Sequence, residues 1–242
     1  MSSLLTLNMF PVSKRSNIPN ISPFCVKIET CLRILNIPYD IFFIKKAPRY
    51  CAPKGKLPFI DIDGQRLGDS EIILKYLAEK KGLNIDKNFS EKEMAAIIAY
   101  KKMLDEHVSF IMSYYRWGSN RYWKALKKFY FPALSAPIRF LWGGYMRYHA
   151  NKYYYAQGIS RHSESEIDAF FDECLFSLSQ LLGEKDYFFD NTPSSLDAAA
   201  FGFLCNIYRF RITKHLTEIG EKYPNLKAHS ERMMTRYFPE RG

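Results

Sequence analysis

The sequence predicts an α/β domain over residues 1–81, a linker over 82–90 and an all-helical domain over 91–242. Before residue 82, short β-branched and aromatic runs alternate with residues at helical spacing, as in α/β proteins. After residue 89, three Ser-x-x-Glu or Ser-x-x-Asp patterns mark helix starts: Ser90–Glu93, Ser163–Glu166 and Ser194–Asp197. A chain of 242 residues is long enough for two domains with cores of their own.

The first helix is predicted to begin after Ser22. Ser22 stands at the N-cap position, and Pro23 stands at the first helical position, where a missing N–H does no harm. One face carries apolar residues at helical spacing: Phe24, Ile28, Cys31, Leu32 and Leu35. The other face carries polar residues: Lys27, Thr30, Arg33 and Asn36. The pattern therefore predicts an amphipathic helix.

Four strands and a second helix complete the predicted α/β domain. The strand signals cover residues 4–10, 39–44, 57–62 and 65–67. Asp63-Gly64 joins the last two strands in a tight turn. The second helix follows Gly68 and is expected to end at Gly82, a residue typical of helix C-termini. The predicted order is β-α-β and then β-β-α, on one four-stranded sheet.

Three short motifs in this domain occur in an informative order: SPFC at residues 22–25, Leu57-Pro58 and Asp69-Ser70. The block that holds them resembles the thioredoxin-like N-terminal domain of glutathione S-transferases. SPFC followed by KIE and later by KGKLPFI is most similar to the failed-axon-connections (Fax) and metaxin-like branch of that superfamily. The resemblance covers nearly the whole chain, and residues 119–160 match least.

The resemblance implies a site for glutathione, the co-substrate, on the N-terminal domain. A cis peptide bond before Pro58 would turn the backbone of Leu57 to pair with the cysteinyl part of the tripeptide. Asp69 and Ser70 match the acidic-Ser pair that holds the γ-glutamyl end, where N–H groups at a helix start would favour a carboxylate. Lys54 and Lys56 are candidates to meet the glycyl carboxylate.

Ser22 and Cys25 are the alternatives for the group beside the glutathione sulfur. In Ser-type transferases, a hydroxyl at the start of the first helix donates a hydrogen bond to the thiolate, and the helix N–H groups lower the thiol pKa. Ser22 would also be the cap of that helix, and two serines of the same loop are replacements for it: Ser13 and Ser16. Cys25 lies one turn into the helix, usually a buried position, so dithiol redox chemistry is disfavoured.

The resemblance also implies a pocket for a small hydrophobic electrophile on the C-terminal domain. Its expected wall lies near the end of the first helix of that domain: Tyr114, Tyr115, Arg116 and Trp117. Catalysis would hold the thiolate and the electrophile in near-attack geometry. Arg116 would stabilise charge on the acceptor, or else serve as an ordinary salt-bridge partner.

Residues 107–163 form a basic aromatic segment. No Asp or Glu lies between His107 and Ser163, whereas nine Lys and Arg residues do, in a chain whose net charge is +10. Three partners fit this composition: an anionic membrane surface, a nucleic acid or an acidic ligand. Nucleic acid is disfavoured because no recognised binding motif accompanies the charge. The structural alternative is that the aromatics form core and acceptor wall and the lysines face solvent.

Residues 129–146 are the predicted lipid-facing element. Metaxin-like relatives act at mitochondrial membranes, which favours peripheral membrane contact by analogy. The stretch is too short to span a bilayer, which needs about 20 apolar residues. Its prolines and glycines are expected to break any helix: Pro132, Pro137, Gly143 and Gly144.

The remaining composition excludes several classes of site. The five cysteines have no C-x-x-C spacing and indicate reduced thiols in a cytoplasmic protein. The five histidines are scattered, so no metal site is expected. The N-terminal residues are a strand candidate rather than a secretory signal, because a basic start and a long apolar run are missing.

Two functions from different classes follow. The first is a glutathione S-transferase that joins glutathione to a hydrophobic electrophile. The second is a non-catalytic Fax/metaxin-like adaptor whose basic aromatic segment binds a membrane surface or a protein. Whether catalysis is retained is left open at this point. A homodimer is expected only because dimers are common in the superfamily that the chain resembles.

Overall fold

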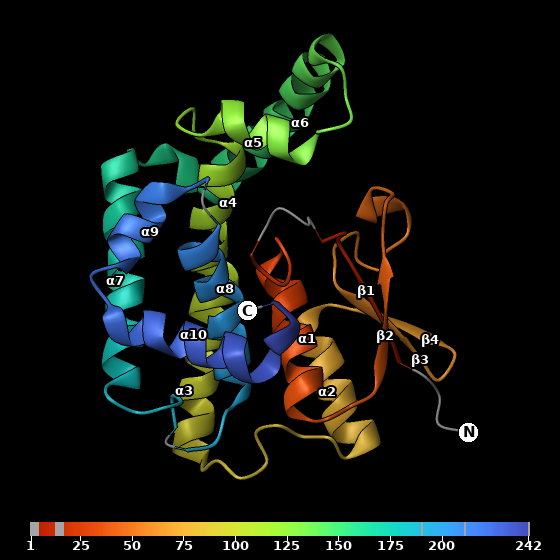
Figure 1. Ribbon diagram of the computed structural model, residues 1–242, viewed down its shortest axis with the longest axis vertical. Coiled ribbons are helices and arrows are strands. Elements are labelled where there is room, and N and C mark those ends of the chain that lie inside the picture. Colours follow the sequence, from red (N-terminus) through yellow and green to blue (C-terminus); the bar gives the residue numbers. More distant parts are fainter. Residues whose placement is uncertain (1–4, 13–16, 190, 211, 242) are drawn as a thin grey trace.

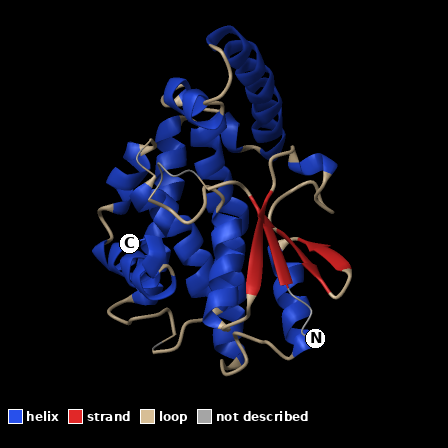
Figure 2. Ribbon diagram, turned by 45° about the vertical axis from the view of Figure 1, so that its right-hand side comes forward, coloured by secondary structure: helices blue, strands red, loops and turns tan. Residues whose placement is uncertain are grey.

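The computed structural model describes residues 5–12, 17–189, 191–210 and 212–241. It confirms an α/β unit followed by an all-helical one (Figure 1). The strands are β1 (Leu5–Met9), β2 (Tyr39–Phe43), β3 (Phe59–Ile62) and β4 (Gln65–Gly68). They form one sheet in the order β2-β1-β3-β4, in which β1 pairs with β2 in parallel and with β3 antiparallel, and β3 pairs with β4 antiparallel. The sheet lies at one side of the molecule and helices make up the rest (Figure 2).

The two helices of the α/β unit are α1 (Pro23–Ile34) and α2 (Ser70–Lys81). Ser22 caps α1, with Pro23 in the first turn, and Gly82 ends α2 in the left-handed conformation that glycine adopts readily. These ends agree with the sequence prediction. A short 3₁₀ turn, Pro48–Tyr50, lies in the connection before β3.

The helical unit begins with a long helix in three parts. The parts are α3 (Glu91–Lys102), a π-helical segment (Met103–Val108) and α4 (Ser109–Trp117). The sequence predicts one helix from Ser90 to about Trp117, and helical backbone does run through, but the wider π turn in its middle is not visible in the apolar spacing. The other helices are α5 (Trp123–Tyr130), α6 (Ala136–Gln157), α7 (Glu164–Leu182), α8 (Ser195–Arg209), α9 (Lys214–Gly220) and α10 (Pro224–Tyr237), with 3₁₀ turns at Ile159–Arg161 and Pro239–Arg241.

All three predicted capping boxes are confirmed. In each, the serine hydroxyl accepts from the backbone N–H three residues on, and the acidic side chain accepts from the serine N–H. The buried carboxylate of Asp197 also accepts from the backbone N–H of Phe188 at 3.1 Å and contacts Nε2 of His229 at 2.9 Å. The Ser194–Asp197 pair is therefore structural. The division of the chain at residues 82–90 stays a prediction, although α2 and α3 do flank that stretch.

Most of helix α1 is buried on both faces, which corrects the predicted polar face at Lys27 and Thr30. The prediction holds at Arg33, which is partly exposed, and at Asn36, which is exposed. Lys27 and Thr30 have no solvent exposure, because α1 lies between the sheet and α8 (Figure 1). The Thr30 hydroxyl donates to the carbonyl of Val26 at 2.7 Å, so its polarity is satisfied within the helix. Spacing along α1 shows one apolar face but cannot show that a second layer covers the other.

The expected helix break within residues 129–146 occurs at Pro132, which lies between α5 and α6. Helix α6 contradicts the rest of that expectation. It runs unbroken for 22 residues through Gly143 and Gly144. Pro137 falls in its first turn, where a missing N–H costs no hydrogen bond, and Pro132 lies before the helix. Glycine within a helix weakens it by only about 1 kcal/mol, which tertiary packing can offset.

Helices α1 and α8 approach each other closely at Gly202. A Cβ atom at Gly202 would lie 2.4 Å from the carbonyl oxygen of Pro23, well inside van der Waals contact. We expect Gly202→Ala to lower the free energy of unfolding by about 2 kcal/mol or more, since the backbone of α1 must move. Gly144→Ala is the matched control, because nothing lies within 4 Å of its new methyl group. Urea denaturation would measure both, and equal stabilities for the two variants would contradict the packing described here.

Candidate functional site

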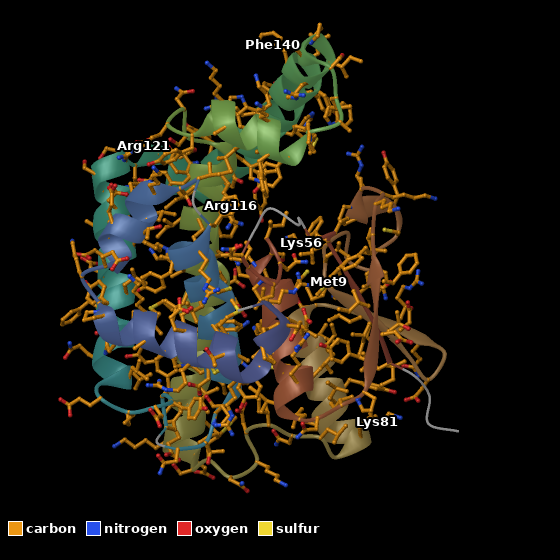
Figure 3. The ribbon with its side chains drawn as sticks, in the orientation of Figure 1. Met9, Lys56, Lys81, Arg116, Arg121 and Phe140 are labelled. Carbon is orange, nitrogen blue, oxygen red and sulfur yellow. The ribbon has the colours of Figure 1, made fainter. Side chains whose placement is uncertain are left out.

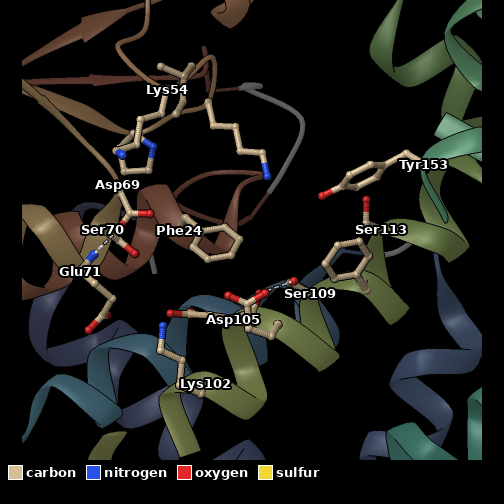
Figure 4. Close-up of a pocket in the computed structure, with 15 residues that line it drawn as sticks. Phe24, Lys54, Asp69, Ser70, Glu71, Lys102, Asp105, Ser109, Ser113 and Tyr153 are labelled. Carbon is tan, nitrogen blue, oxygen red and sulfur yellow. Dashed lines mark hydrogen bonds between the residues drawn. The ribbon is translucent and has the colours of Figure 1, made fainter. Parts of the chain in front are cut away.

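A pocket of about 380 Å³ lies between the α/β unit and the helical unit. Figure 4 shows Asp69, Ser70 and Glu71 on one side of it, Ser113 and Tyr153 on the other, and Phe24 and Asp105 between them. The described residues that line it are Phe24, Lys54, Lys56, Leu57, Pro58, Asp69, Ser70, Glu71, Lys102, Asp105, Glu106, Ser109, Phe110, Ser113 and Tyr153.

The structure brings together every residue predicted for the glutathione-binding half of the site. Lys54, Lys56, Leu57 and Pro58 come from the connection before β3, and Asp69 and Ser70 come from the start of α2. The Leu57–Pro58 peptide bond is cis, as the resemblance implies. The side chain of Lys56 crosses toward the helical unit, where its Nζ lies 5.9 Å from the ring centre of Tyr153.

The start of α2 differs from expectation in one respect. The Asp69 carboxylate accepts hydrogen bonds from the N–H groups of Glu71 at 2.9 Å and Ile72 at 3.3 Å. Two of the N–H groups at this helix start are thus already satisfied by the chain itself. The group that α2 offers to a ligand at this point is Ser70, whose side chain lines the pocket.

Neither Ser22 nor Cys25 is among the described residues that line the pocket. Ser22 is the N-cap of α1, and its hydroxyl accepts from the N–H of Cys25 at 3.4 Å. Ser13 and Ser16 fall outside the described residues. Cys25 is fully buried, and desolvation by burial raises the pKa of its thiol to about 12 despite the hydrogen bond with Ser22. A buried, protonated thiol is inert, so the structure does not support Cys25 as a nucleophile.

None of the four residues predicted for the electrophile wall is among the described residues that line this pocket. Tyr115 is buried, with its hydroxyl bonded to Asp168 at 2.5 Å. The guanidinium of Arg116 donates to the backbone carbonyl of Ile21 at 2.7 Å and to Asn206 Oδ1 at 2.8 Å. Arg116 is therefore absent from the described pocket lining, where it was predicted to stabilise charge on the acceptor, and it forms no salt bridge with a described residue. Trp117 stacks on Tyr130, and Tyr114 lines a separate open hollow beside Tyr148 and Lys152.

An aromatic wall is present, but it is built from residues that the sequence analysis missed. Phe110 of α4 and Tyr153 of α6 stack with ring centres 5.4 Å apart, and Phe24 of α1 lines the pocket with them. Phe110 lies about one turn before Tyr114. Phe110 and Tyr114 both lie at the edge of the core that contains Ile111 and Tyr115, and helical spacing alone could not show which of the two lines the pocket.

A buried ionic cluster reaches the pocket through two lining residues, Glu71 and Asp105. Lys27 of α1, which has no solvent exposure, bridges Glu71 of α2 and Asp105 of the π segment at 2.7 Å each. Lys101 of α3 bonds the other oxygen of Glu71 at 2.9 Å and the hydroxyl of Ser195 at 3.1 Å. The cluster connects α1, α2, the long helix and α8.

The two carboxylates of this cluster differ in proton affinity. Desolvation by burial acts to raise the pKa of Glu71, but the charges and hydrogen bonds of Lys27 and Lys101 outweigh it and lower the pKa to about 2. For Asp105, desolvation exceeds the attraction of Lys27, so its pKa is raised. One oxygen of Asp105, Oδ1, is buried and has no hydrogen-bond partner among the described residues. Asp105 lines the pocket, although this oxygen is itself closed off from solvent.

The π segment positions two acidic side chains at the pocket. It carries Asp105 and Glu106, both of which line the pocket, and the Ser109 hydroxyl bonds the carbonyl of Asp105 just after it. π turns inside α-helices frequently occur at functional sites. In the described parts of the chain, no group of three or more His, Cys, Asp or Glu side chains is arranged to hold a metal ion.

Two family models match the chain. The glutathione S-transferase N-terminal domain matches residues 23–122, and the glutathione S-transferase C-terminal domain matches residues 171–233. The chain belongs to the glutathione S-transferase superfamily. Its relatives, described next, place it in the Fax/metaxin-like branch of that superfamily.

Three relatives illustrate the range of this similarity. Failed axon connections from Drosophila melanogaster is 29% identical over 96% of the chain, which spans 58% of that protein's length. Isoprene-epoxide–glutathione S-transferase from Rhodococcus is 27% identical over 91% of the chain and 94% of the enzyme. Human metaxin-2 is 25% identical over 89% of the chain and 82% of that protein.

Solved structures show the same fold. A glutathione S-transferase from Methylobacterium radiotolerans, in complex with glutathione sulfonate, superposes with a TM-score of 0.62 and covers 98% of this chain and 93% of its own. Its sequence identity is 17%, so the likeness concerns the fold alone.

The ionic cluster predicts a large effect on stability. Lys27→Met keeps most of the side-chain volume but leaves Asp105 without its cation and Glu71 with one instead of two. Removing one partner of a buried ion pair typically costs about 3–5 kcal/mol, so a loss of that order in the free energy of unfolding is expected. Lys75→Met, on the exposed face of α2, is the control and should change stability by less than about 0.5 kcal/mol. A loss no larger than that of the control, measured by urea denaturation, would show that the cluster does not join the units.

Glu71 also predicts a dependence on acid pH. Its pKa falls from an ordinary 4.5 to about 2 in the folded protein, so its contribution is complete above pH 4.5 and is lost as the pH falls toward 2. We expect Glu71→Gln to be less stable than the parent at neutral pH, with a difference that shrinks over this range. Glu79→Gln, on the exposed surface of α2, is the control. Urea denaturation at a series of pH values measures both, and a difference that stays constant down to pH 2 would contradict the assignment.

Proposed function

We propose that this protein binds glutathione in the pocket between its two units and acts as a glutathione S-transferase. The observation that most supports this is the convergence of the Leu57–Pro58 connection, Asp69 and Ser70 on one pocket that also has an aromatic wall. A tripeptide thiol needs polar groups at both ends and an apolar neighbour for its reaction partner. The pocket offers both in one cavity.

The charges of the pocket suit the three ionised groups of glutathione. The N-terminal side presents Lys54 and Lys56, which would meet the glycyl carboxylate as cations. Ser70 would donate its hydroxyl to the γ-glutamyl carboxylate. The adjacent ammonium group would lie beside the Asp105 carboxylate, which lines the pocket, and its positive charge would then lower the raised pKa of that carboxyl.

The aromatic wall would take the electrophile. Tyr153, which stacks on Phe110, lies across the pocket from Ser70, and Phe24 lies between them, so an apolar acceptor held against these rings would face the sulfur of the bound tripeptide. The thiolate would attack the electrophilic carbon and form the C–S bond, while halide leaves or an epoxide C–O bond opens. The protein would contribute mainly by holding the two reactants together. The similarity to an isoprene-epoxide–glutathione S-transferase supports an epoxide as one acceptor to assay.

Binding and turnover are tested separately. Calorimetric titration with glutathione should show saturable binding that weakens about tenfold in Ser70→Ala, which loses a hydrogen bond to a charged group, and in Asp105→Asn, which loses the negative charge beside the ammonium group. Ser177→Ala, on the exposed face of α7, should bind like the parent. Conjugation of 1-chloro-2,4-dinitrobenzene and of a small epoxide then measures catalysis. Absence of glutathione binding by the parent would overturn the proposal, and binding without conjugation of either acceptor would reduce it to a glutathione-binding scaffold.

A non-catalytic adaptor is the second candidate. The exposed aromatic surface of α6 favours an adaptor, because catalysis in the pocket does not require such a surface. The homodimer and the cytoplasmic location stay predictions. Among the described residues, no helix has the length and apolar character needed to cross a bilayer.

A further inference from the structure

Helix α6 projects beyond the rest of the molecule and carries large apolar side chains at its free end. Phe140 lies near the far end of the projecting part (Figure 3), and Figures 1 and 2 show the same projection from two directions. Phe140 is 69% exposed and its neighbour Leu141 is 71% exposed. Three further exposed residues complete what we call the α6 tip: Ile138, Trp142 and Tyr145.

Only one face of α6 is used for packing. The less exposed positions recur at helical spacing along that face: Arg139, Gly143, Arg147, Ala150 and Tyr154. The tip residues lie on other faces or at the helix start and have no covering element among the described residues. Isolated exposed apolar residues need no explanation, but a contiguous group of this kind marks an interaction surface.

The charge around the tip is positive. The segment from residue 108 to 162 contains no carboxylate side chain. Lys127 of α5 extends its ammonium to 5.2 Å from the ring centre of Phe140, so a cation lies directly beside the apolar end. Lys124 and Lys128 are exposed on the same helix and form no ion pair with a described residue. The arginines of α6 have another use, since Arg139 and Arg147 donate to backbone carbonyls.

We propose that the α6 tip and the lysines of α5 form a docking surface for an anionic lipid bilayer. Side chains such as Phe140, Leu141 and Trp142 insert about 5–10 Å into the boundary between head groups and acyl chains, as interfacial helices do. The lysines of α5 then lie at the level of the lipid phosphates. Tryptophan and tyrosine are suited to this boundary because each combines an apolar ring with one polar group.

The shape of the surface favours a bilayer over a folded protein partner. The tip is a projecting end rather than a groove, and a folded partner would need a concave apolar pocket to cover it, whereas a bilayer deforms around it. Because the tip projects, it reaches the lipid before the body of the protein does (Figure 1). The pocket described above does not include any tip residue, so docking and glutathione binding are separate properties.

Vesicle co-sedimentation tests the proposal with the whole chain. The parent is expected to bind vesicles that contain phosphatidylserine, to bind pure phosphatidylcholine vesicles much more weakly, and to be released by raised salt. Lys124→Glu/Lys128→Glu should lower the partition coefficient about 20-fold or more, because each lysine near an anionic surface contributes about fivefold. Lys75→Glu/Lys80→Glu makes the same change in net charge at exposed positions of α2. This control should leave binding within about twofold of the parent.

The apolar contribution has its own pair of variants. Phe140→Ser/Leu141→Ser should weaken binding about tenfold or more, whereas Phe176→Ser, at an exposed site on α7, should not. Bromine-labelled lipids should quench the tryptophan fluorescence of the parent, and Trp142→Phe should remove most of that quenching. Unchanged far-ultraviolet circular dichroism and urea midpoints would show that each variant is folded.

Several outcomes would overturn the proposal. Equal binding to neutral and anionic vesicles, or equal loss in the tip and control variants, would show that this surface does not dock on anionic lipid. Light scattering that shows a dimer in the parent and a monomer in Phe140→Ser/Leu141→Ser, with no vesicle binding, would assign the surface to a second copy of the chain. Binding to an RNA oligonucleotide but not to vesicles would assign it to nucleic acid. Failure of glutathione binding would leave the lipid result unaffected.

Discussion

A single buried ammonium group, that of Lys27, fixes how the two units of this protein meet. It lies in the middle of α1 with no access to water, and its two carboxylate partners come from α2 and from the π segment of the long helix. A buried cation is tolerated only where opposite charges surround it, so these three elements must keep their relative positions. Lys101 extends the constraint to α8 through Ser195, and the Asp86 carboxylate bonds that serine as well.

The pocket derives its character from this constraint. Glu71 is held ionised by two lysines, while Asp105 has one lysine and one oxygen without a partner. Both carboxylates line the pocket, beside an aromatic wall to which the same long helix contributes Phe110. The charges that join the two units therefore also set the electrostatic character of the pocket.

Much of the fold could be predicted from local signals. The helix ends depend on a few neighbouring residues, so they can be recognised from the sequence alone: examples are Ser22 with Pro23, Gly82 and the three capping boxes. The residues of the glutathione-binding half came from a motif resemblance, and the structure gathers them around one pocket. Lys27 could not be placed, because its burial depends on α8, a helix about 170 residues further along the chain.

The errors in the helical unit have the same origin. Tyr115 and Arg116 were expected at the pocket because they lie near the end of a helix. They instead form hydrogen bonds with Asp168 and Asn206, and no local sequence pattern predicts these distant partners. Gly143 was expected to break a helix, whereas its missing side chain makes room for the stem of Lys127 on α5. In each case, a contact between distant segments decided what the local sequence left open.

The close contact of Gly202 with Pro23 has a consequence for what counts as a domain here. By chain order α1 belongs to the α/β unit, yet its second face is covered by α8, and Val26 shares a core cluster with Phe201 and Cys205. The hydrophobic cores therefore interlock across the 82–90 stretch. Cooperativity of unfolding follows shared core rather than chain order. We therefore expect the α/β unit and the helical unit to unfold together.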